Sequence, residues 1–219
     1  MKISKETIAV MKNFASINSN LLIKEGSKLS TLNSASNVLA SATVAETFPI
    51  DFGIYDTNEF LGVLSLFNEP EIEFKEKFAR VSDNGSGVKF YAADPSVLLV
   101  PKKEIKFPAT DVTFDLSSNQ LATIMKTSAV LRAPDVSVVG ADGELSIVVG
   151  DLKNATSNTF DIKIGDTDKT FTANFKIENL KLMPTDYTVS ISSKKISKFV
   201  SVDGNVTVFI ALESTSSFE

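Results

Sequence analysis

Two segments far apart in the chain share one pattern, and this repeat restricts the fold more than any other feature. Residues 2–12 and 115–125 align so that Ser4 matches Ser117, with an apolar residue before each serine and matching apolar positions after it. A serine in that place is typical of a helix N-cap, and the preceding apolar residue can act as a hydrophobic staple. The pattern predicts two amphipathic helices, over residues 4–16 and 117–131, at equivalent places in two similar halves.

A strand that runs directly into a helix also occurs once in each half. Residues 52–54 read as a short strand, and Asp56 then caps a helix whose apolar residues are too dense for a surface helix. The fainter counterpart at residues 174–177 leads into a predicted short helix over residues 178–182, which Pro184 ends. We therefore expect the order helix, strands, strand, helix, strands twice.

Alternating strands and turn signals complete each half. Residues 136–139 and 145–149 flank a hairpin turn at 140–143, and residues 21–23 with the turn at Gly26 take the same part in the first half. The sequence predicts an α+β fold of two similar domains, each with two helices packed on antiparallel β-sheets. We place the first domain at residues 1–93, an extended connector at 94–110 and the second domain at 111–219.

The connector is rich in proline and carries an unusual apolar run. Pro95, Pro101 and Pro108 favour extended structure, and the segment has no helical period. Residues 97–100 are all apolar, which is uncommon in a linker. Two interpretations remain open: the run pairs with a sheet edge and buries two side chains, or it borders a groove for partner peptides.

Several residue types needed for catalysis or metal binding are missing. The chain has no Cys and no His, and it contains neither common glycine-rich phosphate loop. Asp161, Asp166 and Asp168 suggest a cation site, but alternating strands on both sides favour a hairpin turn at 165–169. Ser192 and Lys195 have the spacing of a Ser-Lys nucleophile without an oxyanion element. We expect no enzyme activity, no cofactor and no metal.

The sequence also carries no membrane or export signal. No run approaches the roughly 18 apolar residues that span a bilayer, and charges interrupt the apolar positions of the N-terminal segment, unlike a signal peptide. A cytosolic location is expected.

Positive charge is placed unevenly in an acidic chain. The net charge is −5 and the pI about 5.0, which argues against a protein that grips nucleic acid tightly. Helical wheels nevertheless put Lys5 and Lys12 on the exposed side of the first helix, and Lys126 opposite an apolar arc of the later helix: Leu121, Ile124, Met125 and Leu131. Ordinary solvation explains such lysines, but a local positive face also suits a surface that meets phosphates loosely.

Several stretches resemble the sliding clamp of T-even-type bacteriophages. The similar segments are residues 2–7, 12–19, 54–66, 92–96, 183–187 and 211–213, so both ends and the middle of the chain are involved. Between about 133 and 173 the resemblance is weak, and there the repeat carries the argument.

This resemblance implies a DNA-clamp fold and a function. Three subunits of such a clamp close head-to-tail into a ring of six similar domains, with helices lining the hole. The ring encircles duplex DNA and tethers the replicative polymerase, a clamp loader opens and closes it, and late transcription can use it too. The implied location is the cytoplasm of the infected bacterial host.

The resemblance also suggests which residues meet DNA and partners. The expected DNA-facing side chains are Lys2, Lys5, Lys12, Lys126, Arg132 and Lys181. The expected partner-peptide groove, placed by location alone, comprises Val97, Leu98, Leu99, Ile210 and Leu212. Ser128 and Ala129 occupy a stretch that is more basic in the family, so the second domain has a thinner positive lining. The alternative is a non-enzymatic phage structural protein, a tail or capsid accessory subunit with duplicated β-rich domains.

Overall fold

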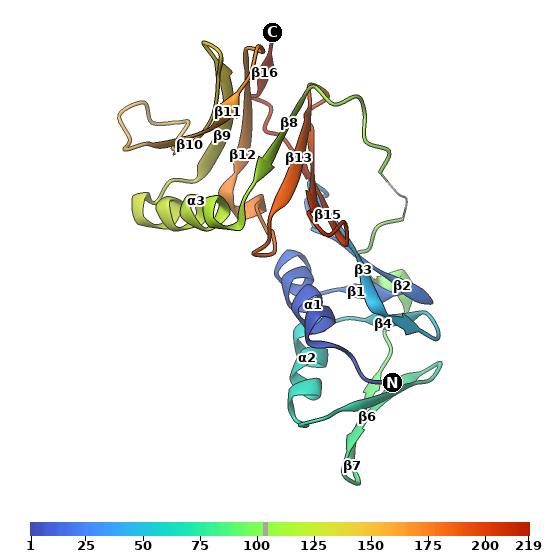
Figure 1. Ribbon diagram of the computed structural model, residues 1–219. Coiled ribbons are helices and arrows are strands. Elements are labelled where there is room, and N and C mark those ends of the chain that lie inside the picture. The colour runs from blue at the N-terminus through green and yellow to red at the C-terminus, as the bar shows by residue number, and fades with distance from the viewer. Residues whose placement is uncertain (103–104) are drawn as a thin grey trace. The chain divides into compact units, whose positions relative to one another are not determined.

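The chain divides into two compact units, which are described one at a time. A computed structural model describes residues 1–102 and 105–219, and the units are Met1–Glu104 and Ile105–Glu219 (Figure 1). This division falls inside the segment 94–110 that the sequence marks as a connector; residues 103–104 of that segment lie outside the described part.

The first unit joins two α-helices to three small antiparallel sheets. Strand β1 pairs with β4, β2 pairs with β3, and the third sheet has the order β5-β6-β7. The backbone of Met1 extends this third sheet beyond β5, because Met1 and Ile72 exchange two hydrogen bonds of 2.7 and 2.8 Å. The elements are α1 (Lys5–Ile17), β1 (Leu21–Ile23), β2 (Gly26–Leu32), β3 (Val38–Phe48), β4 (Phe52–Ile54), α2 (Thr57–Ser65), β5 (Glu71–Phe74), β6 (Phe78–Asp83), β7 (Ser86–Tyr91) and the 3-10 turn η1 (Pro95–Val97).

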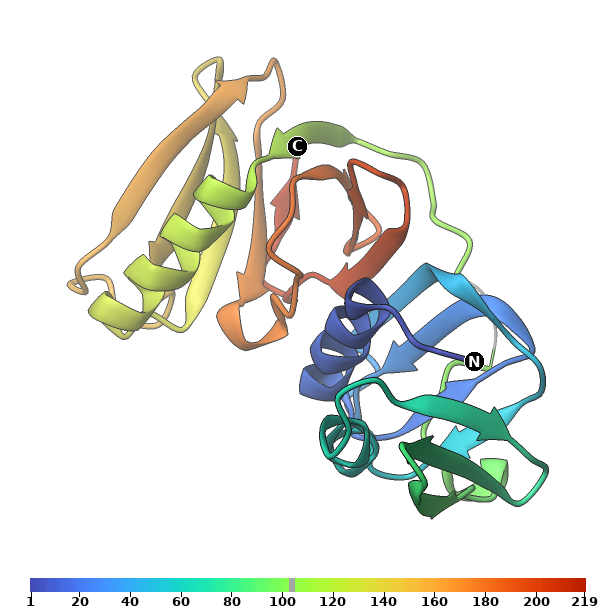
Figure 2. The same ribbon diagram turned by 60° about the horizontal axis from the view of Figure 1, so that its bottom comes forward.

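The two helices of this unit lie side by side and bury one face each (Figures 1 and 2). Ser4 caps α1 by accepting a hydrogen bond from the Thr7 amide, as the sequence predicts. Asp56 caps α2 in the same way through the amides of Asn58 and Glu59. Both caps sit where the apolar pattern begins, so each helix starts with its apolar stripe already facing the core. The largest buried side chains of this core are Phe14, Phe48, Phe52 and Phe60.

The second unit packs one α-helix against two larger antiparallel sheets. Their orders within the unit are β11-β10-β9-β12-β16 and β15-β14-β13-β8. Helix α3 lies over β9 and β10 in both ribbon views (Figures 1 and 2). The elements are β8 (Val112–Leu116), α3 (Ser118–Leu131), β9 (Asp135–Ala141), β10 (Glu144–Gly150), β11 (Phe160–Asp166), β12 (Phe171–Lys176), the 3-10 turn η2 (Ile177–Asn179), β13 (Tyr187–Ser192), β14 (Ile196–Ser201), β15 (Val206–Ala211) and β16 (Ser217–Phe218).

Helix α3 begins as predicted, and its buried face is the predicted one shifted away from Met125 toward Ser128. Ser117 and Gln120 form a complete capping box at its start. Leu121, Ile124 and Ser128 are buried, whereas Met125, placed by the sequence in the apolar arc, is 36% exposed. Burial of Ser128 is possible because its hydroxyl donates to the Ala133 carbonyl at 2.7 Å, which satisfies the polar group where the helix ends.

The element order repeats between the units, with one reduction. In both units a helix is followed by four strands, a short helical element and three strands, in the order that the sequence predicts; the second unit also has β8 before its helix and β16 at its end. In the second unit the short element is the 3-10 turn η2 and not a second α-helix over residues 178–182. The segment between β12 and Pro184 is too short to repeat the helical hydrogen-bond ladder, because the first turn of a helix is costly to form.

The predicted hairpin at residues 165–169 is wrong. Strand β11 pairs with β10 and β12 pairs with β9, so this segment crosses from one side of the β9–β10 hairpin to the other. The β9–β10 turn itself is tight, with Asp142 and Gly143 both at positive φ, as hairpin turns of this type require. Because β9 and β10 pair with each other, only the two outer edges of their hairpin remain for β11 and β12.

The described ends of the connector pack on their own units. Leu98 is 7% exposed and lies beside Gly53, where an added Cβ would stand 2.3 Å from the Ala93 carbonyl oxygen. Leu99 is held through its backbone by the side chains of Asn18 and Asn20. In the second unit Phe107 lies 6.2 Å from Phe209, ring centre to ring centre. The apolar run thus buries Leu98 without forming a strand, and Pro95–Val97 is a 3-10 turn, not extended chain.

Candidate nucleic-acid interface

The exposed stripe of α1 carries two lysines on a small-residue surface. Lys5, Ala9, Lys12 and Ser16 are the exposed side chains of this face. Lys5 and Lys12 stand two helical turns apart, roughly 10 Å along the axis. Within the described residues neither lysine has an acidic group at ion-pair distance, whereas Lys2, Lys75, Lys163 and Lys176 do. This face can therefore offer both charges to an anionic ligand.

A hollow of about 510 Å³ runs along α1 beside α2. Its lining combines Lys2, Lys5 and Lys12 with apolar side chains from both helices and the segment that follows α2. Helix α2 contributes Leu61, Leu64 and Ser65 and has no lysine or arginine. The positive charge of this surface therefore comes from α1 and the residues before it, while α2 acts as support.

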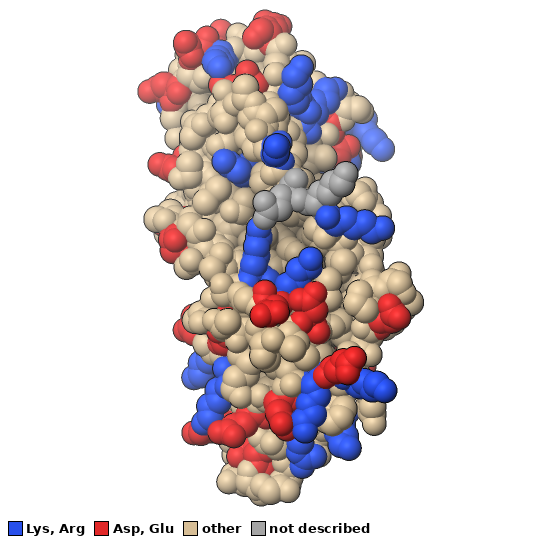
Figure 3. All heavy atoms as spheres, turned by 90° about the vertical axis from the view of Figure 1, so that its right-hand side faces the viewer, with Lys and Arg blue, Asp and Glu red and all other residues tan. Residues whose placement is uncertain are grey.

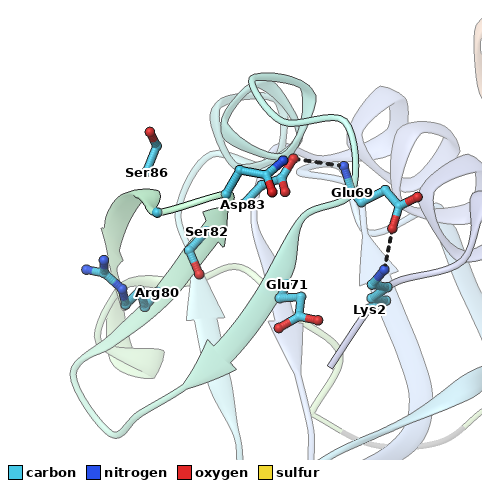
Figure 4. Close-up of a pocket in the computed structure, with 9 residues that line it drawn as sticks. Lys2, Glu69, Glu71, Arg80, Ser82, Asp83 and Ser86 are labelled. Carbon is cyan, nitrogen blue, oxygen red and sulfur yellow. Dashed lines mark hydrogen bonds and ion pairs between the residues drawn. The ribbon is translucent and has the colours of Figure 1, made fainter.

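Lys2 differs from the other two lysines because it is already paired. Its ammonium lies 2.6 Å from Glu69, and this hydrogen bond raises the pKa of Lys2 above its ordinary 10.5. Figure 4 shows the pair at the rim of a hollow of about 430 Å³, where Glu71 and Asp83 also point inward. The net charge that Lys2 adds to the surface is therefore small.

The second unit presents fewer positive side chains. Lys126 is exposed on α3, and Arg132 is exposed at its C-cap with a left-handed backbone, φ 52°. Lys181 is exposed just after η2. The rest of the exposed α3 face is neutral: Ala122, Thr123, Met125, Ala129 and Val130, which is 73% exposed.

The five residues expected in a partner groove differ in accessibility. Val97 is 61% exposed and Leu99 38%, so both can contact a ligand. Leu98 and Leu212 are each 7% exposed, and Ile210 is fully buried on the inward face of β15. Ile210 is a core residue, because alternate positions of β15 point into the unit.

One residue that supports this surface has no signal in the sequence. Glu46 on β3 accepts hydrogen bonds from the Ser4 amide and the Thr7 hydroxyl at the start of α1. Burial raises the pKa of this carboxyl, but the hydrogen bonds from Thr7 and Ser4 lower it by more, so it lies below its ordinary 4.5. A single glutamate in an alternating strand is indistinguishable from a solvated one until the tertiary contact is known.

The remaining surface is mixed in charge. On the face shown in Figure 3, lysine and acidic side chains are interspersed over the two units. Within residues 1–102 and 105–219, no three acidic side chains converge as a cation site requires. None of the helices described is long and apolar enough to cross a membrane.

The fold belongs to a known class. The structure of PCNA from A. fulgidus with the C-terminal region of FEN-1 bound matches this chain with a TM-score of 0.71 at 12% identity, covering 99% of this chain and 98% of that one. At that identity the likeness establishes the fold alone. The chain therefore has the DNA-clamp fold, and the predicted α+β class is confirmed.

Sequence comparison then gives the family. Residues 4–100 match the family model "DNA polymerase processivity factor", and residues 113–214 match "gp45 sliding clamp, C terminal". The sliding clamp of Vibrio phage KVP40 is 34% identical over 98% of this chain and its own full length. That of Enterobacteria phage T4 is 30% identical over the full length of both. The chain belongs to the phage sliding clamps and is a DNA polymerase processivity factor; the alternative of a phage structural protein receives no support.

Proposed function

We propose that three copies of this chain close head-to-tail into a ring that encircles duplex DNA and keeps the replicative polymerase on its template. The observation that carries this proposal is a pair of unlike sheet edges, one in each unit. Among the described strands, β7 ends the sheet of the first unit and β11 ends a sheet of the second. Unpaired strand edges invite pairing with another chain, and two different edges on one chain produce a head-to-tail contact.

The side chains of these two edges complement each other. On the inner side, Val88 and Phe90 of β7 and Ile162 and Ile164 of β11 are half-buried apolar residues. On the outer side, β7 exposes Lys89, and β11 exposes Asp161 next to Lys163, whose charge is already paired with Glu144 and Asp166. Pairing of the edges would bury the apolar side chains and bring opposite charges near one another.

Inside such a ring, Lys5, Lys12, Lys126 and Arg132 would meet the phosphates. Their number is small, and contacts to phosphate carry no sequence information. The ring replaces tight binding by a topological link, which explains how a protein with net charge −5 can stay on DNA and still slide. Lys181 is a weaker candidate, and Lys2 contributes little because Glu69 neutralises it.

The remaining assignments follow from family membership. We assign residues 1–93 and 111–219 as the two clamp domains, with 94–110 as their connector. A clamp loader opens the ring, late-transcription factors can share it, and the protein works in the cytoplasm of the infected host without cofactor or catalysis of its own. In the first unit Val97 and Leu99, with Leu98 at the margin, form the proposed peptide contact; in the second unit Leu212 remains a candidate and Ile210 is left out because it is buried.

Two measurements test the ring. Sedimentation or light scattering at micromolar concentration should give the mass of three chains. With its cognate polymerase and loader, the protein should lengthen the products made on a long primed template. If the protein is a monomer and leaves product length unchanged, the proposed ring of three chains is excluded.

A further inference from the structure

The N-terminal ends of α1 and α3 are each bound by a carboxylate from outside the helix. Glu46 on β3 accepts from the Ser4 amide and from the Thr7 hydroxyl of α1. Asp186, which directly precedes β13, accepts from the Ser118 amide of α3 at 2.7 Å. These contacts are separate from the serine caps, which satisfy the Thr7 and Gln120 amides at 3.2 Å each.

The two carboxylates are themselves held by a sheet. Glu46 lies in β3 between Thr43 and Phe48, which pair with Lys28 and Gly26 of β2 on the two sides of a register shift. The Asp186 carbonyl accepts a hydrogen bond from Val202, at the far end of the β13–β14 hairpin. Each carboxylate therefore connects the first turn of a helix to a strand, or to the residue before a strand, in the same unit.

Such a contact is strong for two reasons. The first amides of a helix have no partner within the helix, and the helix dipole favours negative charge there. Hydrogen bonds to an ionised group are also stronger than neutral ones. Thr7 is only 1% exposed, and without Glu46 its buried hydroxyl would keep only the bond of 3.1 Å that it accepts from the Ser4 hydroxyl, with no acceptor for its own proton among the described contacts.

We infer that Glu46 is a positioning residue for DNA contact: it fixes the first turn of α1, and with it Lys5 and Lys12, against β3. This inference rests on the proposed DNA-facing role of α1. Lys5 directly follows the Ser4 amide that Glu46 binds, so loosening this turn moves Lys5 first and Lys12 less. Asp186 has the corresponding role for α3 and Lys126, with a weaker effect because Asp186 is exposed.

Whether Glu46→Gln weakens or strengthens DNA contact distinguishes a positioning role of Glu46 from an effect of its charge alone. Removing a negative charge near the lysines makes the surface more positive, and electrostatics alone would strengthen contact with DNA. Loss of positioning has the opposite effect. A weaker DNA contact in Glu46→Gln therefore cannot be an effect of net charge.

The experiment compares full-length trimers of Glu46→Gln and Glu76→Gln. Glu76 is exposed, and its replacement makes the same change in net charge. Product length with polymerase and loader is measured over a series of salt concentrations. We expect Glu46→Gln to shorten the products about two- to fivefold at near-physiological salt and to reduce the salt dependence, since fewer phosphates are neutralised. Hydrogen exchange of the α1 amides should accelerate about tenfold, the effect of losing roughly one hydrogen bond.

The same substitution on a background of Lys5→Gln with Lys12→Gln shows whether Glu46 acts through the lysines. We expect no further shortening there. Equal shortening on both backgrounds, or products as long as those of Glu76→Gln, would overturn the inference. Thr7→Val, which keeps every charge and removes one donor, should reproduce part of the loss if Glu46→Gln folds poorly. If the double lysine variant alone matches the wild type, the DNA-facing role of α1 itself fails, and that result identifies the cause.

Discussion

At the scale of single residues, nearby acidic side chains determine whether the charge of an exposed lysine is available for phosphate contacts. Lys2 and Lys5 are both exposed, but Lys2 forms an ion pair with Glu69, whereas no described acidic side chain pairs with Lys5. Charge reversal of Lys5 and Lys12 to glutamate should shorten polymerase products by about tenfold or more, because the proposed ring of three chains would lose six positive contacts and gain six repulsive ones. Melting temperature should hardly change, since both side chains are solvent-facing.

The matched control for this charge reversal is Lys24→Glu with Lys77→Glu, which alters two other exposed lysines. This variant should keep full activity in the same polymerase assay. Equal losses in both double variants would mean that net charge, and not the α1 face, determines retention on DNA.

Tyr187 gives a second prediction at this scale. It is fully buried and donates a hydrogen bond of 3.1 Å to the Met183 carbonyl. Burial raises the pKa of Tyr187 from 10.0 to about 12. The neutral hydroxyl therefore stabilises the fold fully below pH 10, and this contribution is lost as pH rises through about 12. In an ultraviolet titration, Tyr187→Phe should remove the last tyrosine step; its removal by Tyr91→Phe instead would contradict the assignment.

At the scale of elements, the caps of α3 can be tested with neighbouring serines. Ser117 takes part in the capping box, whereas Ser118 contributes its backbone amide to Asp186. Ser117→Ala should lower the free energy of unfolding by about 1 kcal/mol, a typical cost of losing such a cap. Ser118→Ala should change it by less than about half of that, because its hydroxyl only adds to the bond that its amide already donates to the exposed Asp186. Urea unfolding measures both, and equal effects would argue against the cap.

Local signals also explain which elements the sequence could predict. Ser4, Asp56 and Ser117 mark helix starts through bonds to amides two or three residues away, so the starts of all three α-helices were predictable. The partner of β11 was not, because pairing depends on which edge of the β9–β10 hairpin is free.

In the candidate site, too, the features that depend on local sequence were predictable and those that depend on distant contacts were not. The exposure of Lys5 and Lys12 follows from helical periodicity and was predictable. The Lys2–Glu69 pair and the Glu46 contacts join residues that are 67 and about 40 positions apart, and no short pattern encodes them. Ile210 was expected in a groove only from its location near the C-terminus, yet strand alternation turns it into the core.

At the scale of the whole molecule, one substitution in β11 tests the ring interface. Ile162→Lys places a charge among the apolar side chains that the edges would bury, so the trimer should fall to a monomer with an unchanged far-ultraviolet spectrum. Val202→Lys is the control, because Val202 is 72% exposed in the β14–β15 turn. A trimer that survives Ile162→Lys at micromolar concentration would place the interface elsewhere.

The unlike edges β7 and β11 have a consequence for the orientation of the proposed ring on DNA. A ring joined only through one edge of each kind has all subunits pointing the same way around it, so its two flat faces expose different loops. DNA has no such overall front and back, but a primer does, because it is extended at one end. A ring with unlike faces can be threaded in one of two orientations. Only one of these two orientations puts a partner that binds one face on the side of the ring where the primer grows.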